Sequence, residues 1–317
     1  MGVASYTAMT DEPVCPPKNA AAPHRRVGLD AISDADGSVR VLAIDHRDSM
    51  RRFLASTGPD NASPADGASI TALKADIVRA LIEISSGVML EPEFSIPQLL
   101  DAGLIPGNVG VIAALEAQGY LDDLSTAVTS VLPGWSPRLA LEAGASMVKL
   151  LLPYRPGSEL AETQEAVARD VLASSEAAGI PLVLEPLLWG VSDPDEHSRL
   201  VVETAERFAP LRPGLLKLPF PGDGRADASA SAGACRAITE VCVNNSLRWA
   251  LLSGGGTFER FEDQLSVALA EGCSGFMVGR ALWGDAVLTA GPDRLDALHR
   301  IVVPRLRHLN LLTTSRG

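Results

Sequence analysis

The sequence predicts one (β/α)8 barrel, the TIM-barrel fold, preceded by a flexible N-terminal arm. Three observations support this fold class. Apolar strand-like runs alternate with segments of helical periodicity about eight times along the chain. The strand-like runs are almost continuously apolar, as expected for a parallel sheet that is covered on both faces. The length of 317 residues also suits one large α/β barrel.

Each expected strand is a short apolar run bounded by Gly, Pro or polar residues, which is typical of a buried parallel strand. The first run reads VRVLAIDHR, and later ones include GVMLEP, SMVKLLLPY and PLVLEPLLW. In chain order, we expect strands at 39–47, 87–92, 129–135, 146–154, 181–189, 215–220, 249–253 and 275–278. The pattern is weakest at 129–135.

Helices are expected where apolar residues recur at intervals of three and four. The segment SITALKADIVRALIEIS, over 69–85, has this periodicity. The other expected helices cover 109–118, 136–144, 158–179, 195–208, 228–244, 257–271 and 293–309. A doubly wound open sheet is the rival architecture. No G-x-G-x-x-G follows the first strand, which disfavours a dinucleotide-binding version of that sheet.

The first 27 residues differ in composition from the rest of the chain. Residues 1–27 are rich in Ala, Pro and polar residues and contain no apolar core of the signal-peptide kind. We expect this segment to be a flexible arm. The barrel domain would then cover residues 28–317.

The overall charge limits the classes of partner. The formal net charge is −12, with 46% hydrophobic and 21% charged residues. Nucleic acids and anionic membranes bind basic patches, so we expect neither as a partner. A small anionic substrate needs only a few local cations and is compatible with this charge. We also expect the barrel to form a homo-oligomer.

Cysteine usage and hydropathy bear on the compartment. The cysteines are Cys15, Cys235, Cys242 and Cys273, and none forms a C-x-x-C pair. Such sparse cysteines predict a reducing, cytoplasmic compartment. No apolar run approaches the roughly 20 residues of a membrane span.

Several expected strands carry a single charged residue among apolar neighbours. These residues are Asp45, Lys149, Glu185 and Lys217. Because side chains alternate along a strand, Lys217 should share its face with Leu215, while Leu216 and Leu218 face the helices. A single strand-end charge is often only a snorkelling or ion-paired side chain. Four charges at one level favour a polar pocket at the carboxyl ends of the strands.

This set of side chains suits Schiff-base chemistry. A buried amine beside another cation loses its proton more readily, and the neutral amine attacks a carbonyl to form an imine. The iminium then acts as an electron sink for carbon–carbon cleavage. We expect Lys217 to be the nucleophile, Lys149 the neighbouring cation and Glu185 the general acid and base. Asp45 would hydrogen-bond a substrate hydroxyl or orient a lysine.

A glycine-rich segment, LLSGGGTFERF, predicts a phosphate site. It places Ser253, Gly254 and Gly255 between a strand and a helix, where backbone N–H groups can approach an anion. Arg280 follows the next strand, and the loops after strands seven and eight commonly bind phosphate in barrels. The alternative is a plain glycine turn in which Thr257 caps the helix and Arg280 lies on the surface.

The motifs VLAIDHRDSMRR, ASMVKLLLPY, PLVLEPLLW, LLKLPFP, LLSGGG and VGRALWGDAV, in this order, resemble the class I aldolases of the tagatose-1,6-bisphosphate aldolase type. That family includes the aldolase that cleaves sulfofructose-1-phosphate. The likeness covers residues 39–290. It implies a (β/α)8 aldehyde-lyase without metal or other cofactor. Such an enzyme would cleave a phosphorylated ketose through a lysine Schiff base into dihydroxyacetone phosphate and an aldehyde.

The resemblance also implies roles for individual residues. Lys217 matches the Schiff-base lysine of the family, and Glu185 matches its proton-shuttling glutamate. The substrate-contacting and phosphate-binding positions of the family match Asp45, Lys149, Ser253, Gly254 and Arg280.

Two departures from the family concern the substrate. The first-strand motif of the family usually reads Asp-Gln-Arg, whereas His46 replaces the Gln here. The lysine strand continues LPFPGDG rather than with a Val-rich run. We therefore expect His46 and Arg47 to contact the aldehyde half of a substrate that the resemblance does not name. The alternative for His46 is a neutral strand-end histidine bonded to a backbone carbonyl.

Two other functions compete with this interpretation. A non-catalytic sugar-phosphate-binding barrel, acting as a sensor or interaction protein, predicts phosphate binding without an imine. A metal-dependent aldolase needs a histidine cluster, and only His46 lies on an expected inner strand. We therefore expect no metal.

Overall fold

The computed structural model of the protein describes residues 25–55, 66–117, 123–222, 228–290 and 293–314. Nearly all of the arm expected over 1–27 lies outside the described residues. Its flexibility and the domain boundary at residue 28 therefore stay predictions. At the end of this segment, Arg25 donates hydrogen bonds to the carbonyl groups of Ile105 and Val109.

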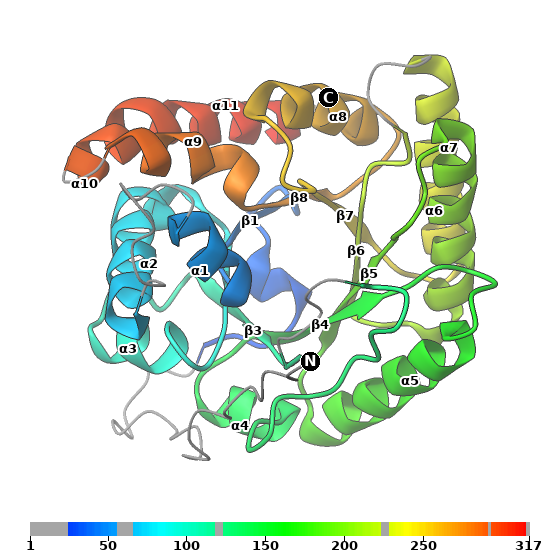
Figure 1. The fold of residues 1–317 in the computed structure, drawn as a ribbon, viewed down its shortest axis with the longest axis horizontal. Coiled ribbons are helices and arrows are strands. Elements are labelled where there is room, and N and C mark those ends of the chain that lie inside the picture. Colours follow the sequence, from blue (N-terminus) through cyan, green and yellow to red (C-terminus); the bar gives the residue numbers. More distant parts are fainter. Residues whose placement is uncertain (1–24, 56–65, 118–122, 223–227, 291–292, 315–317) are drawn as a thin grey trace, which may run out of the picture.

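The strands are all parallel and close into a barrel in the order β1 to β8 (Figure 1). This topology confirms the predicted fold class. The strands are β1 (Val39–Ala43), β2 (Gly87–Leu90), β3 (Gly110–Ala114), β4 (Met147–Pro153), β5 (Leu182–Leu187), β6 (Leu215–Leu218), β7 (Trp249–Leu252) and β8 (Gly275–Val278).

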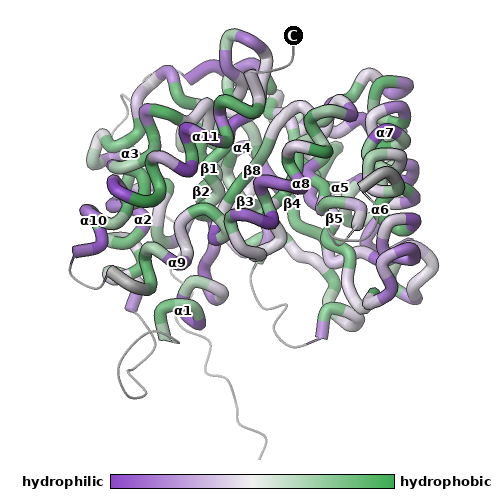
Figure 2. The backbone as a smooth tube through the Cα atoms, turned by 90° about the horizontal axis from the view of Figure 1, so that it is seen from above, coloured by the Kyte–Doolittle hydropathy of each residue, from purple (hydrophilic) through white to green (hydrophobic). Residues whose placement is uncertain are grey.

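Helices surround the ring of strands (Figure 1). In Figure 2 the strands are green, whereas the outer helices, such as α6 and α7, alternate between green and purple. The helices are α1 (Asp48–Ala55), α2 (Gly67–Leu81), α3 (Ile96–Asp101), α4 (Pro137–Glu142), α5 (Ala161–Ala178), α6 (Pro194–Phe208), α7 (Ala228–Asn244), α8 (Phe258–Ala270), α9 (Arg280–Ala290), α10 (Arg294–Ala297) and α11 (Val303–Thr314). Within the described ranges, none is both long and apolar enough to span a membrane.

The third strand of the barrel corrects two predictions. The segment 109–118, predicted as a helix, instead contains β3, which pairs with β2 and β4. The strand predicted at 129–135 is not formed, and Val131 makes only an isolated bridge to Glu116. The Ala, Leu and Glu residues of GVIAALEA favour a helix by intrinsic propensity. Burial of every residue of β3 between the barrel interior and the helices overrides that preference.

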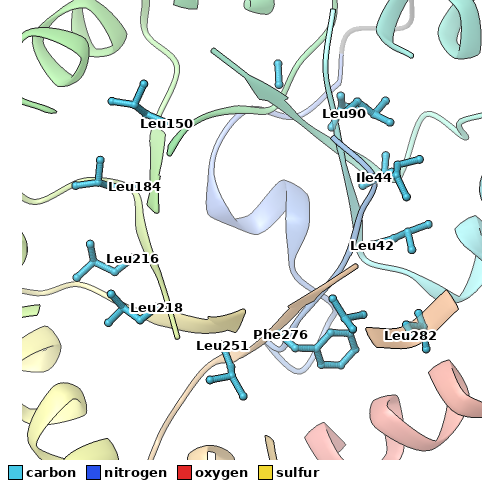
Figure 3. Close-up of a cluster of buried hydrophobic side chains, with 14 of the residues drawn as sticks. Leu42, Ile44, Leu90, Leu150, Leu184, Leu216, Leu218, Leu251, Phe276 and Leu282 are labelled. Atoms are coloured by element: carbon cyan, nitrogen blue, oxygen red, sulfur yellow. The ribbon is translucent and has the colours of Figure 1, made fainter. Parts of the chain in front are cut away.

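The core has an inner and an outer layer that follow the alternation of side chains along the strands. Leu215 belongs to the inner cluster, together with Met89, Met147, Val183 and Met277. The outer cluster contains Leu42, Leu90, Leu150, Leu184, Leu216, Leu218 and Leu251, which point from the strands toward the helices (Figure 3). The predicted parity of the lysine strand is therefore confirmed.

A short 3₁₀ segment, η1 (Leu29–Ile32), closes the amino-terminal end of the barrel. Ile32 is fully buried in the inner cluster. Gly110 makes this possible, since a Cβ atom there would lie 2.3 Å from the carbonyl oxygen of Ala31. The polar cavity described next lies at the opposite, carboxyl-terminal end of the strands.

Candidate active site

A cavity of about 290 Å³ lies at the carboxyl ends of the strands. Its lining includes nine residues that the sequence predicts as catalytic or substrate-binding. These are Asp45, His46, Lys149, Glu185, Lys217, Ser253, Gly254, Gly255 and Arg280. The strands thus bring together side chains that are up to 235 residues apart in the sequence, as Asp45 and Arg280 are (280 − 45).

Lys217 lies on β6 with its amine in an ion pair. The side chain is buried, and Nζ lies 2.7 Å from Oε1 of Glu185. The Sδ atom of Met89 lies 3.8 Å from the same nitrogen. One carboxylate on the neighbouring strand is therefore within reach for proton transfer to or from this amine.

Lys149 lies at the centre of three carboxylates. Its Nζ is 2.9 Å from Asp45 Oδ2, 2.7 Å from Glu116 Oε1 and 3.0 Å from Glu185 Oε2. Burial disfavours the charged amine, but these carboxylates raise the pKa of Lys149 well above its usual value. Burial would likewise raise the pKa of Asp45, yet Lys149 and Lys217 lower it far below its usual value. Both groups are therefore charged at neutral pH.

Glu116 is a member of this cluster that the sequence interpretation missed. It follows β3 and is 2% exposed. Oε1 accepts a hydrogen bond from Lys149, and Oε2 accepts one from the backbone N–H of Leu151. The missed signal is a charged residue at the end of the apolar run GVIAALE. Glu116 thus has the same pattern as the charged residues at the other strand ends, but the segment 109–118 is predicted as a helix.

His46 lines the cavity as a neutral imidazole. Burial, Arg280 and Lys217 lower its pKa to about 4, against an opposing effect of Asp45. Its ring packs edge-on against Trp283, with centroids 5.9 Å apart. Within the described part of the chain, Nδ1 has no hydrogen-bond partner. The predicted alternative, a bond from His46 to a backbone carbonyl, is therefore not formed at this nitrogen.

The glycine loop after β7 also lines the cavity, and only β8 separates β7 from β1 in the barrel. Gly254 and Gly255 have φ angles of 57° and 73°, a conformation that side chains disfavour. Ser253 Oγ accepts a hydrogen bond of 3.4 Å from the backbone N–H of Gly279. These contacts join the loop after β7 to the start of α9.

Arg280 is the first residue of α9 and faces this glycine loop. A Cβ atom at Gly255 would lie 3.5 Å from Arg280 Nη2. Its Nε is buried, and among the described residues no carboxylate pairs with its guanidinium. Burial, together with the nearby Arg52, lowers the pKa of Arg280. An uncompensated cation at a helix N-terminus beside backbone N–H groups is suited to bind an anion.

Arg47 is the one predicted site residue that does not line the cavity. It is 1% exposed and pairs with Glu93 at 2.5 Å. It also donates a hydrogen bond to the backbone carbonyl of Glu116. Arg47 therefore connects the end of β1 to the ends of β2 and β3, and it contacts the carboxylate cluster only through the backbone.

These features define the class of protein. A closed (β/α)8 barrel holds a buried lysine–glutamate pair and an uncompensated arginine in one cavity at its catalytic end. This is the arrangement of a barrel enzyme that acts on a small anionic molecule. Among the described residues, no group of three or more His, Cys, Asp and Glu is placed to hold a metal ion.

A family model described as DeoC/LacD family aldolase matches residues 39–285. The chain therefore belongs to the DeoC/LacD aldolase family, and the family expected from the ordered motifs is confirmed. It is 26% identical to tagatose 1,6-diphosphate aldolase of Lactococcus lactis, over 88% of this chain and 95% of that protein. It is 27% identical to the same-named protein of Streptococcus agalactiae serotype V, over 82% and 85%.

Solved structures share the fold. An archaeal fructose-1,6-bisphosphate aldolase, with its catalytic lysine bound to a carbinolamine intermediate, matches with a TM-score of 0.59 and 20% identity. That match covers 89% of this chain and 96% of the other. A protein from Corynebacterium glutamicum matches with a TM-score of 0.61 and 19% identity, over 88% and 89%. These similarities support the barrel architecture.

Proposed function

We propose that the protein is a class I aldolase that cleaves a phosphorylated ketose through a Schiff base on Lys217. The products would be dihydroxyacetone phosphate and an aldehyde. The observation that carries the proposal is the buried pair of Lys217 Nζ and Glu185 Oε1, 2.7 Å apart, in the cavity that Arg280 also lines. The naming of the relatives as tagatose 1,6-diphosphate aldolases supports a ketose bisphosphate or a related sugar phosphate as substrate.

The first step forms the imine. Glu185 accepts a proton from Lys217, and the neutral amine attacks the C2 carbonyl of the ketose. The carbonyl oxygen takes up a proton and becomes the hydroxyl of a carbinolamine. Protonated Glu185 then protonates that hydroxyl, which leaves as water while the C=N bond forms. The positive charge of the iminium replaces the ammonium charge that Lys217 carried.

The second step breaks the C3–C4 bond. Glu185, ionised again after proton transfer, accepts the proton of the C4 hydroxyl. The electron pair of the C3–C4 bond moves into the iminium and gives an enamine, while C4 leaves as the aldehyde. Protonation of C3 and addition of water to the regenerated iminium release dihydroxyacetone phosphate and free Lys217. Atoms balance because the water lost in imine formation is regained in hydrolysis.

Asp45, Lys149 and the phosphate loop would hold the substrate in place. Lys149 stays charged between its carboxylates, so it can donate hydrogen bonds to hydroxyl groups next to the reacting carbons. Asp45 stays ionised and can accept one. Ser253, Gly254 and Arg280 would bind the phosphate, which fixes the distance from that group to the carbonyl carbon.

Reductive trapping tests the mechanism. The sequence contains only four lysines, Lys18, Lys74, Lys149 and Lys217, so a modified lysine is easily assigned by peptide mass spectrometry. With dihydroxyacetone phosphate and borohydride, we expect one adduct per chain, on Lys217. The Lys217→Met variant should give none. Phosphate binding without any adduct would favour the non-catalytic binding barrel. A retro-aldol screen over a ketose bisphosphate, a sulfosugar phosphate and a deoxy-ketogluconate phosphate would then identify the substrate.

Arg280→Ala should weaken substrate binding rather than stop the chemistry. Loss of a charge-assisted contact of roughly 1.5–3 kcal/mol corresponds to about a 10- to 100-fold higher KM. We expect kcat to change much less, because Arg280 is remote from the bond that breaks. Steady-state kinetics with the substrate found in the screen would measure both. An unchanged KM would contradict the phosphate site assigned to this residue.

A further inference from the structure

A second, smaller cavity adjoins the glycine loop. It has a volume of about 180 Å³ and shares Leu252, Ser253 and Gly254 with the main cavity. Its other residues are Gly256 of the same loop and residues from α6, from the segment after β6 and from α8. Lys217, Glu185 and Arg280 all line the main cavity, and none of them lines the second one. The second cavity is therefore distinct from the candidate active site, although both adjoin the glycine loop.

Besides Ser253, its polar lining includes three side chains that have no hydrogen bond or ion pair among the described residues. Gln264 on α8 is 8% exposed, and its amide makes no hydrogen bond with any described residue. His197 on α6 has a buried Nδ1 atom that also lacks a partner. Arg260 on α8 forms no ion pair within the described ranges, and a Cβ atom at Gly256 would lie 3.7 Å from its Cδ atom. Arg260 is exposed, whereas Gln264 and the Nδ1 atom of His197 are buried. Buried polar atoms without partners cost free energy, which a bound ligand would recover.

The side chains that line this cavity carry a positive charge. No Asp or Glu is among the described residues that line it. This is notable in a chain of net charge −12. Burial and the nearby Arg260 lower the pKa of His197, so the two side chains are close enough for their charges to interact. A cationic arginine, an imidazole and an amide can all donate hydrogen bonds to one anion.

Size and shape limit the ligand. The volume is well below the range of roughly 300–1,000 Å³ that is usual for drug-sized ligands. Pro219, Phe220 and Phe261 form an apolar wall. We propose that this cavity is a second anion site, which binds inorganic phosphate or the phosphate group of a small monoester through Arg260, His197 and Gln264. It is distinct from the site for the substrate phosphate beside Arg280.

Calorimetric titration of the full chain with inorganic phosphate tests the proposal. We expect two phosphate ions per wild-type chain. Arg260→Ala should weaken the second site by at least about tenfold, through loss of a charge-assisted contact. Gln264→Leu should also weaken it, because the amide is lost while the volume is nearly kept. Arg280→Ala should remove the other ion and leave the site at Arg260.

A matched variant controls for charge. Arg199→Ala removes an exposed arginine on α6 near His197 in sequence, but unlike Arg260 it does not line the cavity and it pairs with Glu203. It should bind phosphate as the wild type does. Thermal unfolding without phosphate would check that each variant is folded. A wild type that binds one ion, lost only in Arg280→Ala, would overturn the proposal. So would two ions of unchanged affinity in both Arg260→Ala and Gln264→Leu. Glycerol phosphate in place of phosphate shows whether a monoester binds more tightly.

Discussion

Lys217→Met should lower the retro-aldol turnover number by about 10⁴-fold or more, the loss expected when the nucleophile of a covalent mechanism is removed. Lys217 is buried and its Nζ lies 2.7 Å from Glu185. Among the described lysines, only Lys149 also pairs with this glutamate and could replace Lys217 as a nucleophile. Lys149 is held as a cation by three carboxylates and cannot act as a neutral amine at neutral pH. The assay is release of dihydroxyacetone phosphate, measured with a coupled enzyme.

A second variant separates charge from nucleophilicity. Lys217→Arg keeps a cation beside Glu185, but a guanidinium does not lose its proton and forms no Schiff base. It should be as inactive as Lys217→Met and should still bind phosphate at the glycine loop. Retention of more than about one per cent of wild-type turnover by Lys217→Arg would show that Lys217 acts only through its charge and would contradict the covalent mechanism.

The sequence predicts much of this site because strand alternation is a local property. Once Leu216 and Leu218 are assigned to the helix-facing side, Lys217 must point into the barrel. The same rule applies to Lys149 and Glu185, and the structure brings all three together in one cavity. The alternation of about eight strands and helices also predicts a closed barrel, although the third strand lies at β3 and not at 129–135.

Other parts of the site depend on contacts that no local pattern contains. Glu116 was missed because periodicity alone does not show whether the short apolar run before it is a helix or a strand. Only the pairing of this run with β2 and β4 makes it a strand. Arg47 is one residue from His46 in sequence, yet its side chain leaves the cavity to pair with Glu93. Such choices are set by the position of carboxylates on neighbouring strands, which the sequence of β1 does not encode.

A buried ion pair behind the site was missed for a similar reason. Lys74 on α2 pairs with Glu91 at the end of β2, and both side chains are fully buried. Glu91 also accepts hydrogen bonds from the backbone N–H groups of Glu93 and Phe94. In the sequence, Lys74 appears as an ordinary polar residue of an amphipathic helix. Its burial depends on how α2 packs against the barrel.

Lys149→Met should lower the free energy of unfolding as well as impair catalysis. The variant leaves Asp45 and Glu116 without their central cation in a buried cluster, and breaking one partner of a buried ion pair costs about 3–5 kcal/mol. Urea unfolding at pH 7 would measure this loss. As a control, Arg138→Met breaks an exposed pair with Glu142 and should cost less than about 1 kcal/mol.

The pH dependence has a definite sign. The pKa of Asp45 is lowered in the fold, so its stabilising contribution is present above its unfolded value of about 3.9 and is lost as pH falls further. The pKa of Lys149 is raised, so its contribution is complete below its unfolded value of about 10.4. At pH 5 to 9 the wild type therefore keeps both contributions, and its stability should change little through this cluster.

Lys149→Met should behave differently over the acidic part of that range. Buried carboxylates without a cation take up protons more readily, so the folded variant binds more protons than the unfolded chain as pH falls. The difference in unfolding free energy between wild type and variant should therefore be smaller at pH 5 than at pH 7. Adding Glu116→Gln to Lys149→Met removes one of the unpaired carboxylates and should recover part of the loss. If the loss of unfolding free energy in the double variant equals the sum of the losses in the two single variants, Glu116 and Lys149 do not interact. The charge cluster would then not stabilise these strand ends.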